Sequence, residues 1–166
     1  MKVLFLDHDG PIVLSNSTRF NELGLDSEFE SFDKQAVIVL NEIITETSCE
    51  IVTSSDWRHN LTLEQLGELY TIRGIIKRPI SVTGYKPGKG SEIEECRAWE
   101  IQLWLAEHPD VIGWCAVDDM DLAETFGPIS GNSNGMLSNF VQTPNSKKGI
   151  TEEGVKEKII KILNNK

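Results

Sequence analysis

The sequence predicts an α/β fold with a central parallel sheet. Two observations indicate this fold. Short apolar runs typical of doubly buried strands alternate along the chain with stretches whose apolar residues recur at helical spacing. Three of these runs end directly in acidic or hydroxyl residues, and the carboxyl ends of parallel strands meet at one edge of a sheet. We therefore expect these polar side chains to gather at one site.

Length and charge limit the kinds of protein that this chain can be. With 166 residues, of which 39% are hydrophobic, it suits one globular domain, which we place at residues 1–166. The formal net charge of −10 argues against an extended nucleic-acid-binding face, because such faces neutralise phosphates with clustered Lys and Arg. A small phosphorylated substrate, or a nucleic-acid phosphate end held locally, is compatible with this charge. We expect a monomer or a weak dimer.

The cysteines and the N-terminal sequence indicate a cytoplasmic protein. Cys49, Cys96 and Cys115 are odd in number and match no zinc-ligand spacing, so we interpret them as reduced thiols. The first residues lack the long apolar segment of a secretory signal, and no stretch approaches the length of a membrane span. We therefore expect no membrane association.

The first half of the chain predicts two strands and two helices. Residues 3–6 form an unbroken apolar run typical of a central strand, and residues 15–32 are polar, as in a loop with room for one short helix. A helix begins after Asp33, whose side chain can cap it. The second strand, residues 50–53, is rich in β-branched residues. The next helix presents on one face Leu63, Leu66, Leu69 and Tyr70.

The middle of the chain predicts a weaker strand, a loop and a third helix. Residues 80–83 are the strand candidate, and the Gly- and Lys-rich residues 84–90 form the loop. Ser91-x-x-Glu94 fits a capping box, so a helix is expected to begin there and to end before Pro109.

The last part of the chain predicts two strands and a final helix. Residues 111–117 are typical of a buried strand, and residues 139–142 of an edge strand. Between them, residues 126–139 are rich in Gly, Ser and Asn and indicate a long loop. From Thr151 onwards, apolar residues at helical spacing predict an amphipathic helix.

Three sets of polar residues follow predicted strands. Asp7 and Asp9 come directly after the first strand and are followed by Gly10, which allows a sharp turn. Two carboxylates this close repel each other, so their place at the end of a buried strand indicates a cation or a catalytic task. The residues that follow the second and fourth predicted strands are Ser54, Ser55, Asp118 and Asp119.

These residues resemble the motifs of the haloacid dehalogenase (HAD) superfamily of phosphatases. Its first, second and fourth motifs are matched by Asp7-His8-Asp9-Gly10, Ser54 and Asp118-Asp119. A wider resemblance, to small cap-less members that include domains attached to RNA-repair proteins, rests on residues 32–58, 100–105 and 140–143. The resemblance implies a Rossmann-like three-layer sandwich. Its central parallel sheet would have the strand order 3-2-1-4-5, and there would be no large cap domain.

The resemblance also implies roles for the motif residues. Asp7 would be the nucleophile that forms an aspartyl-phosphate, and Asp9 the acid/base that protonates the leaving oxygen. Ser54 would hydrogen-bond a phosphoryl oxygen. Mg²⁺ would be the cofactor, since carboxylate oxygens are the ligands that this ion prefers in proteins. The implied metal ligands are Asp7, Asp9, Asp118 and Asp119.

Several other residues have two readings. Arg97 has the preferred spacing for the basic residue of the third motif, which binds phosphate, while Lys89 and Lys86 lie further upstream and are alternatives. Arg58 is a candidate for substrate contact, with a structural salt bridge as its alternative. His8 lies between the two acids and is a candidate ligand, but strand alternation points it away from both, which favours a packing or hydrogen-bonding role.

The motifs together predict a magnesium-dependent phosphomonoester hydrolase. Because the segment after the first strand is short, we expect an open site, and a nucleotide or a polynucleotide phosphate end is the first substrate expectation. The alternatives are a sugar or other small-metabolite phosphate, and a catalytically idle binding protein of the same fold. A receiver-type phosphoacceptor domain would have its acidic pair after the first strand, the reverse of the order here. An EF-hand fails because Thr18 stands where the chelating Glu should be.

Overall fold

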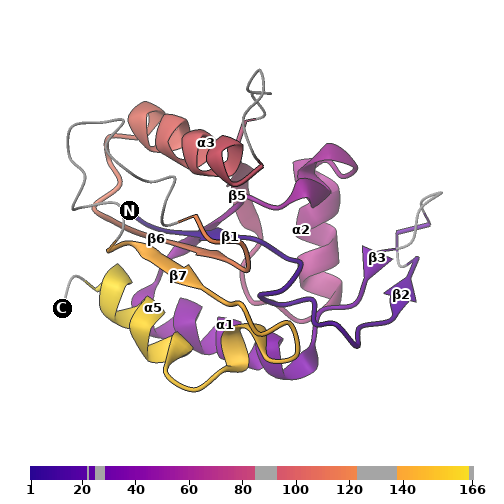
Figure 1. Ribbon diagram of the computed structural model, residues 1–166. Coiled ribbons are helices and arrows are strands. Elements are labelled where there is room, and N and C mark those ends of the chain that lie inside the picture. The colour runs from indigo at the N-terminus through magenta and orange to yellow at the C-terminus, as the bar shows by residue number, and fades with distance from the viewer. Residues whose placement is uncertain (22, 25–28, 85–92, 123–137, 165–166) are drawn as a thin grey trace.

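A five-stranded parallel sheet forms the centre of the fold (Figure 1). The computed structural model describes residues 1–21, 23–24, 29–84, 93–122 and 138–164, with only the backbone for residues 93–95. The strands of the sheet are β1 (Lys2–Leu6), β4 (Glu50–Thr53), β5 (Pro79–Val82), β6 (Gly113–Asp118) and β7 (Phe140–Gln142). They lie in the order β5-β4-β1-β6-β7, and each adjacent pair is parallel. Counted along the chain within this sheet, that is the predicted order 3-2-1-4-5.

Helices cover both faces of the sheet (Figure 1). The described α-helices are α1 (Lys34–Thr47), α2 (Leu63–Ile72), α3 (Ile93–Glu107) and α5 (Val155–Leu163). Leu4 and Leu6 of β1 belong to a core shared with α1, α2 and α5, whereas Val3 and Phe5 belong to a core shared with α3. All four side chains are at most 1% exposed. A strand buried on both faces explains the unbroken apolar run, and the predicted three-layer sandwich is confirmed.

Side-chain caps fix the starts of two helices on this framework. The Asp33 carboxylate accepts a hydrogen bond of 2.9 Å from the Ala36 amide, so the predicted cap of α1 is confirmed. Thr62 and Gln65 form a reciprocal capping box at the start of α2. Each cap contributes about 1 kcal/mol. None of the described helices is both long and apolar enough to cross a membrane.

The segment between β1 and α1 differs from its prediction. Its described part contains no helix but an antiparallel hairpin, made of β2 (Arg19–Phe20) and β3 (Phe29–Glu30). The Arg73 guanidinium, at the end of α2, donates hydrogen bonds to the carbonyl oxygens of both β3 residues. This contact joins residues more than forty positions apart. The local residue pattern could not indicate it.

The final helix begins later than predicted. Gly149–Thr151 form a short 3-10 helix, and α5 starts at Val155 after Gly154, which has φ +83°. A left-handed residue interrupts a right-handed helix, so the prediction of a helix from Thr151 is wrong by one turn. The predicted capping box at Ser91 and most of the loop over residues 126–139 lie outside the described residues.

Gly149 presses against the loop that follows β1, and alanine is expected to be poorly tolerated there. It has φ +50°, and a Cβ atom on it would overlap the carbonyl oxygens of Gly10 and Pro11. Gly149→Ala is therefore expected to lower the free energy of unfolding by roughly 3 kcal/mol or more, from left-handed strain and forced backbone displacement. Gly154→Ala is the matched control, with φ +83° and no atom within 4 Å of the new Cβ. It should cost about 1–2 kcal/mol. Equal losses in urea unfolding would contradict the close contact.

Candidate functional site

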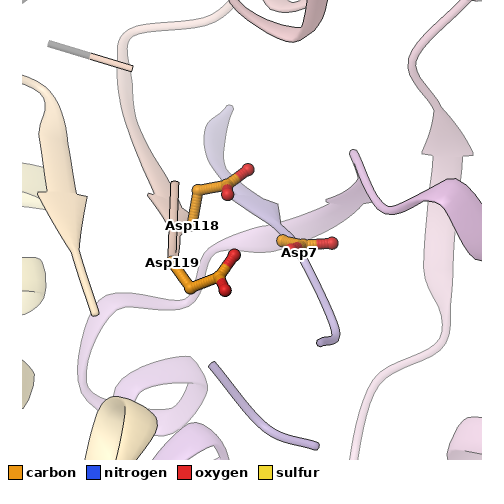
Figure 2. Close-up of side chains that lie close together, drawn as sticks. All are labelled: Asp7, Asp118 and Asp119. Carbon is orange, nitrogen blue, oxygen red and sulfur yellow. The ribbon is translucent and has the colours of Figure 1, made fainter. Parts of the chain in front are cut away.

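Three carboxylates meet at the carboxyl edge of the sheet. Asp7 follows β1, and its amide donates a hydrogen bond of 3.0 Å to the carbonyl oxygen of Val117 in β6, which holds the two strand ends side by side. Asp7, Asp118 and Asp119 each offer a carboxylate oxygen, and these oxygens all lie within 4.8 Å of one another (Figure 2). The predicted gathering of acids at this edge of the sheet is therefore confirmed for Asp7, Asp118 and Asp119.

Two of these carboxylates are almost fully buried. Asp7 is 3% exposed and Asp118 is 1% exposed, whereas Asp119 reaches solvent. Burial, followed by repulsion from Asp118, raises the pKa of Asp7 well above its ordinary value. Burial likewise raises the pKa of Asp118 to about 6, against the opposing effect of a nearby arginine. The site is thus one in which negative charge needs compensation.

Arg97 supplies the compensating charge. Its Nη1 lies 2.9 Å from Asp118 Oδ2 and 3.1 Å from Asp7 Oδ2, and its Nη2 lies 3.1 Å from Asp56 Oδ1. The residue sits in the second turn of α3 and is 5% exposed, so its guanidinium is directed into the acidic group rather than to solvent. The structure thus places the preferred third-motif candidate in the site. The alternatives Lys86 and Lys89 lie outside the described residues.

The Asp9 carboxylate is not among those that lie within 4.8 Å of one another, so of the four predicted metal ligands the structure brings together Asp7, Asp118 and Asp119. The side chain of Asp9 is exposed, and its Oδ2 accepts a hydrogen bond of 2.9 Å from the indole Nε1 of Trp57. Partial burial raises the pKa of Asp9, while the bond from Trp57 opposes this shift. The carboxylate therefore lies beside the cluster, on the loop that follows Asp7, and the role of Asp9 in metal binding stays a prediction.

Gly10 explains how the loop after β1 fits next to the acidic pair. It has φ +93°, and a Cβ atom on it would lie 2.5 Å from the Cβ of Asp119. A larger residue would meet both left-handed strain and a direct clash. The glycine of the D-x-D-G motif therefore allows the loop and Asp119 to approach each other.

Ser54 lies level with Asp7 at the same edge. Leu6 and Thr53 are register partners in the β1–β4 pair, and the Ser54 amide donates a hydrogen bond of 3.1 Å to the Leu6 carbonyl oxygen. The side chain is 1% exposed. The predicted phosphate-binding serine thus stands beside the predicted nucleophile.

Arg58 is engaged in contacts within the protein. Its Nη2 forms a buried ion pair of 2.6 Å with Glu100 of α3, and its Nη1 donates to the carbonyl oxygens of Ser54 and Ser55. These bonds tie the loop after β4 to the helix that carries Arg97. The geometry favours the structural alternative for Arg58 over substrate contact.

His8 is a core residue, as its alternation in the strand predicts. It is 0% exposed, and its Nε2 lies 2.7 Å from the Tyr70 hydroxyl oxygen. Burial lowers the pKa of His8 to about 3, so the ring is neutral at physiological pH. Its buried ring anchors the backbone between Asp7 and Asp9 to the core.

Asp56 is the residue of this site that sequence reasoning missed. Its side chain is 62% exposed, and its carboxylate forms an ion pair with Nη2 of Arg97, the nitrogen that faces away from Asp7 and Asp118. Its position two residues after Ser54 could have indicated it, because polar residues just beyond a strand end lie at the carboxyl edge of a parallel sheet, where ligands bind.

The donor set suits a hard divalent cation. The cluster of Asp7, Asp118 and Asp119 offers carboxylate oxygens, the ligands that Mg²⁺ prefers, and it combines buried and solvent-reaching members. Within the part of the chain that the structure describes, Arg97 is the cation in contact with Asp7 and Asp118. One guanidinium does not balance three carboxylates. These residues therefore fit a magnesium ion.

The strand order, with carboxylates at the ends of β1 and β6 and an arginine between them, is the arrangement expected of a HAD-type domain. The comparison with known families narrows this class. The chain belongs to the family described as the HAD domain in Swiss Army Knife RNA repair proteins, whose model matches residues 3–155. The predicted superfamily and the resemblance to RNA-repair domains are thus confirmed. Neither the curated proteins nor the solved structures gave a match.

Proposed function

We propose that this chain is a magnesium-dependent phosphomonoester hydrolase that acts through an aspartyl-phosphate. The observation that carries the proposal is the environment of Asp7. Its buried carboxylate lies within 4.8 Å of two further acids and contacts Arg97, while a second carboxylate, Asp9, stands two residues away outside that group. A nucleophile beside a cation site, with a separate acid/base on the same loop, suits phosphoryl transfer through a covalent intermediate.

The proposed reaction has two steps. An oxygen of Asp7 attacks the phosphorus atom while the bond to the leaving oxygen breaks, and Asp9 gives its proton to that oxygen. The Asp9 carboxylate then takes a proton from water, whose oxygen attacks the phosphorus of the aspartyl-phosphate. Inorganic phosphate leaves, Asp7 is again a carboxylate and Asp9 is again protonated.

The other site residues would stabilise charge during both steps. Arg97 offsets the charge of Asp7 and of the phosphoryl group, and the Ser54 hydroxyl can donate to a phosphoryl oxygen. A bound Mg²⁺, held by the three carboxylates of Figure 2, would neutralise charge on the equatorial oxygens of the phosphoryl group. The Asp9 carboxylate would serve in proton transfer.

A nucleotide or a polynucleotide phosphate end is the substrate that we propose. The family is one of domains in RNA-repair proteins. In the described residues between β1 and α1, the regular structure is a hairpin with two residues in each strand, and this small size supports the proposal of a site open to a bulky substrate. With a net charge of −10, binding through the terminal phosphate alone is favoured over binding along a broad basic face. We also propose a reducing compartment such as the cytoplasm, in keeping with three free cysteines.

A substrate panel tests the proposal. The purified chain is incubated with Mg²⁺ and an aryl phosphate, 3′- and 5′-phosphorylated oligonucleotides, nucleoside monophosphates and sugar phosphates, and released phosphate is measured. We expect hydrolysis that stops on chelation, with the highest kcat/KM on a nucleotide or an oligonucleotide end. A preference for sugar phosphates would replace the substrate assignment. Failure to hydrolyse any member would favour the idle binding protein.

Magnesium should also stabilise the folded protein in the absence of substrate. A ligand that binds the folded state alone, at ten times its Kd, adds about 1.4 kcal/mol, or roughly 3–6 °C in Tm for a chain of this size. NaCl at equal ionic strength only screens charge and should not reproduce the shift. Asp118→Asn should largely abolish it. Equal shifts with both salts, in the parent and in the variant, would mean that the acids form no metal site.

A further inference from the structure

Trp57 is held rigidly beside the loop that follows β1. It lies in the 3-10 helix η1 (Asp56–His59), and its amide donates to the hydroxyl of the capping residue Ser55. Its ring packs at centroid distances of 4.9 Å from His8, 5.0 Å from Phe29 and 5.7 Å from Phe32. The residue is 7% exposed. Aromatic contacts with these three residues thus fix the direction of its indole N–H.

That N–H is aimed at one oxygen of Asp9. The Nε1 to Oδ2 distance is 2.9 Å, and an indole can donate but not accept, so the bond needs an acceptor at Asp9. Among the described residues, Trp57 is the side-chain hydrogen-bond donor that the Asp9 carboxylate has. An exposed Asp side chain without such a bond would sample several rotamers.

We propose that Trp57 is a positioning residue that orients Asp9 for proton transfer. The inference rests on the proposed function, in which Asp9 is the acid/base. Because Oδ2 is occupied by the indole, Oδ1 is the atom that carries the proton to the leaving oxygen and later receives one from water. The bond to Oδ2 is compatible with both states, since this oxygen accepts whether the group is an acid or a carboxylate.

Leaving-group dependence tests this role. Protonation matters for a leaving alkoxide, which is a strong base, and little for a dinitrophenolate, which is a weak one. Trp57→Phe keeps an aromatic ring in the packing and removes the N–H. We expect its kcat/KM for an alkyl phosphate to fall by about 10-fold or more, and for dinitrophenyl phosphate by less than about 3-fold. Loss of packing alone would lower both values equally, and that result would overturn the proposal.

Trp104→Phe is the matched control. The Trp104 indole donates a hydrogen bond of 3.0 Å to the Ser81 hydroxyl, and the residue is 5% exposed, so the variant loses a comparable bond away from Asp9. We expect it to leave the ratio of the two kcat/KM values unchanged. A changed ratio in this variant as well would overturn the assignment to Trp57.

An NMR measurement tests the contact independently of turnover. The Nε1–H resonance of Trp57 is identified by its absence from the spectrum of Trp57→Phe. Asp9→Ala should shift this resonance and speed its exchange with water, whereas Asp110→Ala, at the opposite end of β1 beside Met1, should not. An unmoved resonance in Asp9→Ala would overturn the proposal. A moved resonance in a chain without phosphatase activity would support the contact and reject the proposed function.

Discussion

Asp7→Asn is expected to abolish turnover, with kcat lowered by roughly 10⁴-fold or more. The amide has nearly the same volume as the carboxylate but cannot form the aspartyl-phosphate. The fold should remain intact, because Arg97 keeps its contacts with Asp118 and Asp56. Phosphate release from the substrate preferred by the parent is the measurement.

The control for this substitution is Asp33→Asn. It makes the same chemical change at a helix cap, where asparagine serves as well as aspartate, so activity and stability should stay near those of the parent. If Asp7→Asn kept substantial activity, the covalent mechanism would be refuted.

Asp7→Asn should also change how the metal-free protein responds to pH. Burial, followed by repulsion from Asp118, raises the pKa of Asp7 above the value of 3.8 that it has when unperturbed. A group with a raised folded-state pKa contributes stability that is fully present below the unfolded pKa and is lost as the pH rises through the folded pKa. With a chelator present, the parent should therefore lose more stability than Asp7→Asn as the pH is raised from 4 to neutrality. Parallel pH profiles of the unfolding free energy would contradict this.

Arg97→Met is expected to be the most destabilising substitution in the site. Removing one partner of a buried ion pair typically costs 3–5 kcal/mol, because the remaining charges stay buried without compensation. Arg97 contacts the two most buried carboxylates of the site, so we expect a loss of about this size in urea unfolding.

Arg19→Met is the control for the arginine substitution. Arg19 forms an ion pair with Glu30, and the Arg19 side chain is 67% exposed. Exposed pairs contribute about 1 kcal/mol or less to the free energy of unfolding. Millimolar Mg²⁺ should restore part of the stability of Arg97→Met and raise its Tm by more than that of the parent. A variant as stable as the parent without Mg²⁺ would mean that Arg97 does not compensate the acids.

Much of the site could be predicted because its residues stand directly after strands. A strand end is visible in the sequence where an apolar run stops, and parallel pairing then brings Asp7, Ser54 and Asp118 to one edge. The strand order came from the resemblance, since apolar runs alone do not determine which strands are neighbours. The need for a basic residue also came from the resemblance, and spacing before the acidic pair then favoured Arg97 over Lys86 and Lys89.

Contacts between distant residues could not be predicted. A tryptophan after a strand is usually a core residue, and nothing in its neighbourhood shows that its N–H reaches Asp9. The place of Asp9 outside the cluster of Asp7, Asp118 and Asp119 is likewise not visible in the sequence. The alternatives for Arg58 could be weighed only with its buried partner Glu100 in view. Each of these depends on tertiary packing, which local spacing does not encode.

The central place of β1 in the sheet has a consequence for synthesis of the chain. Its apolar side chains leave the ribosome before those of both neighbouring strands, because Lys2–Leu6 pairs with Glu50–Thr53 and with Gly113–Asp118. Pairing over such sequence distances is slow, and a bare apolar strand is open to association with other chains. The carboxylates of Asp7 and Asp118 cannot meet until residue 118 has been translated. Nascent chains shorter than this are therefore expected to aggregate unless a chaperone shields the first strand.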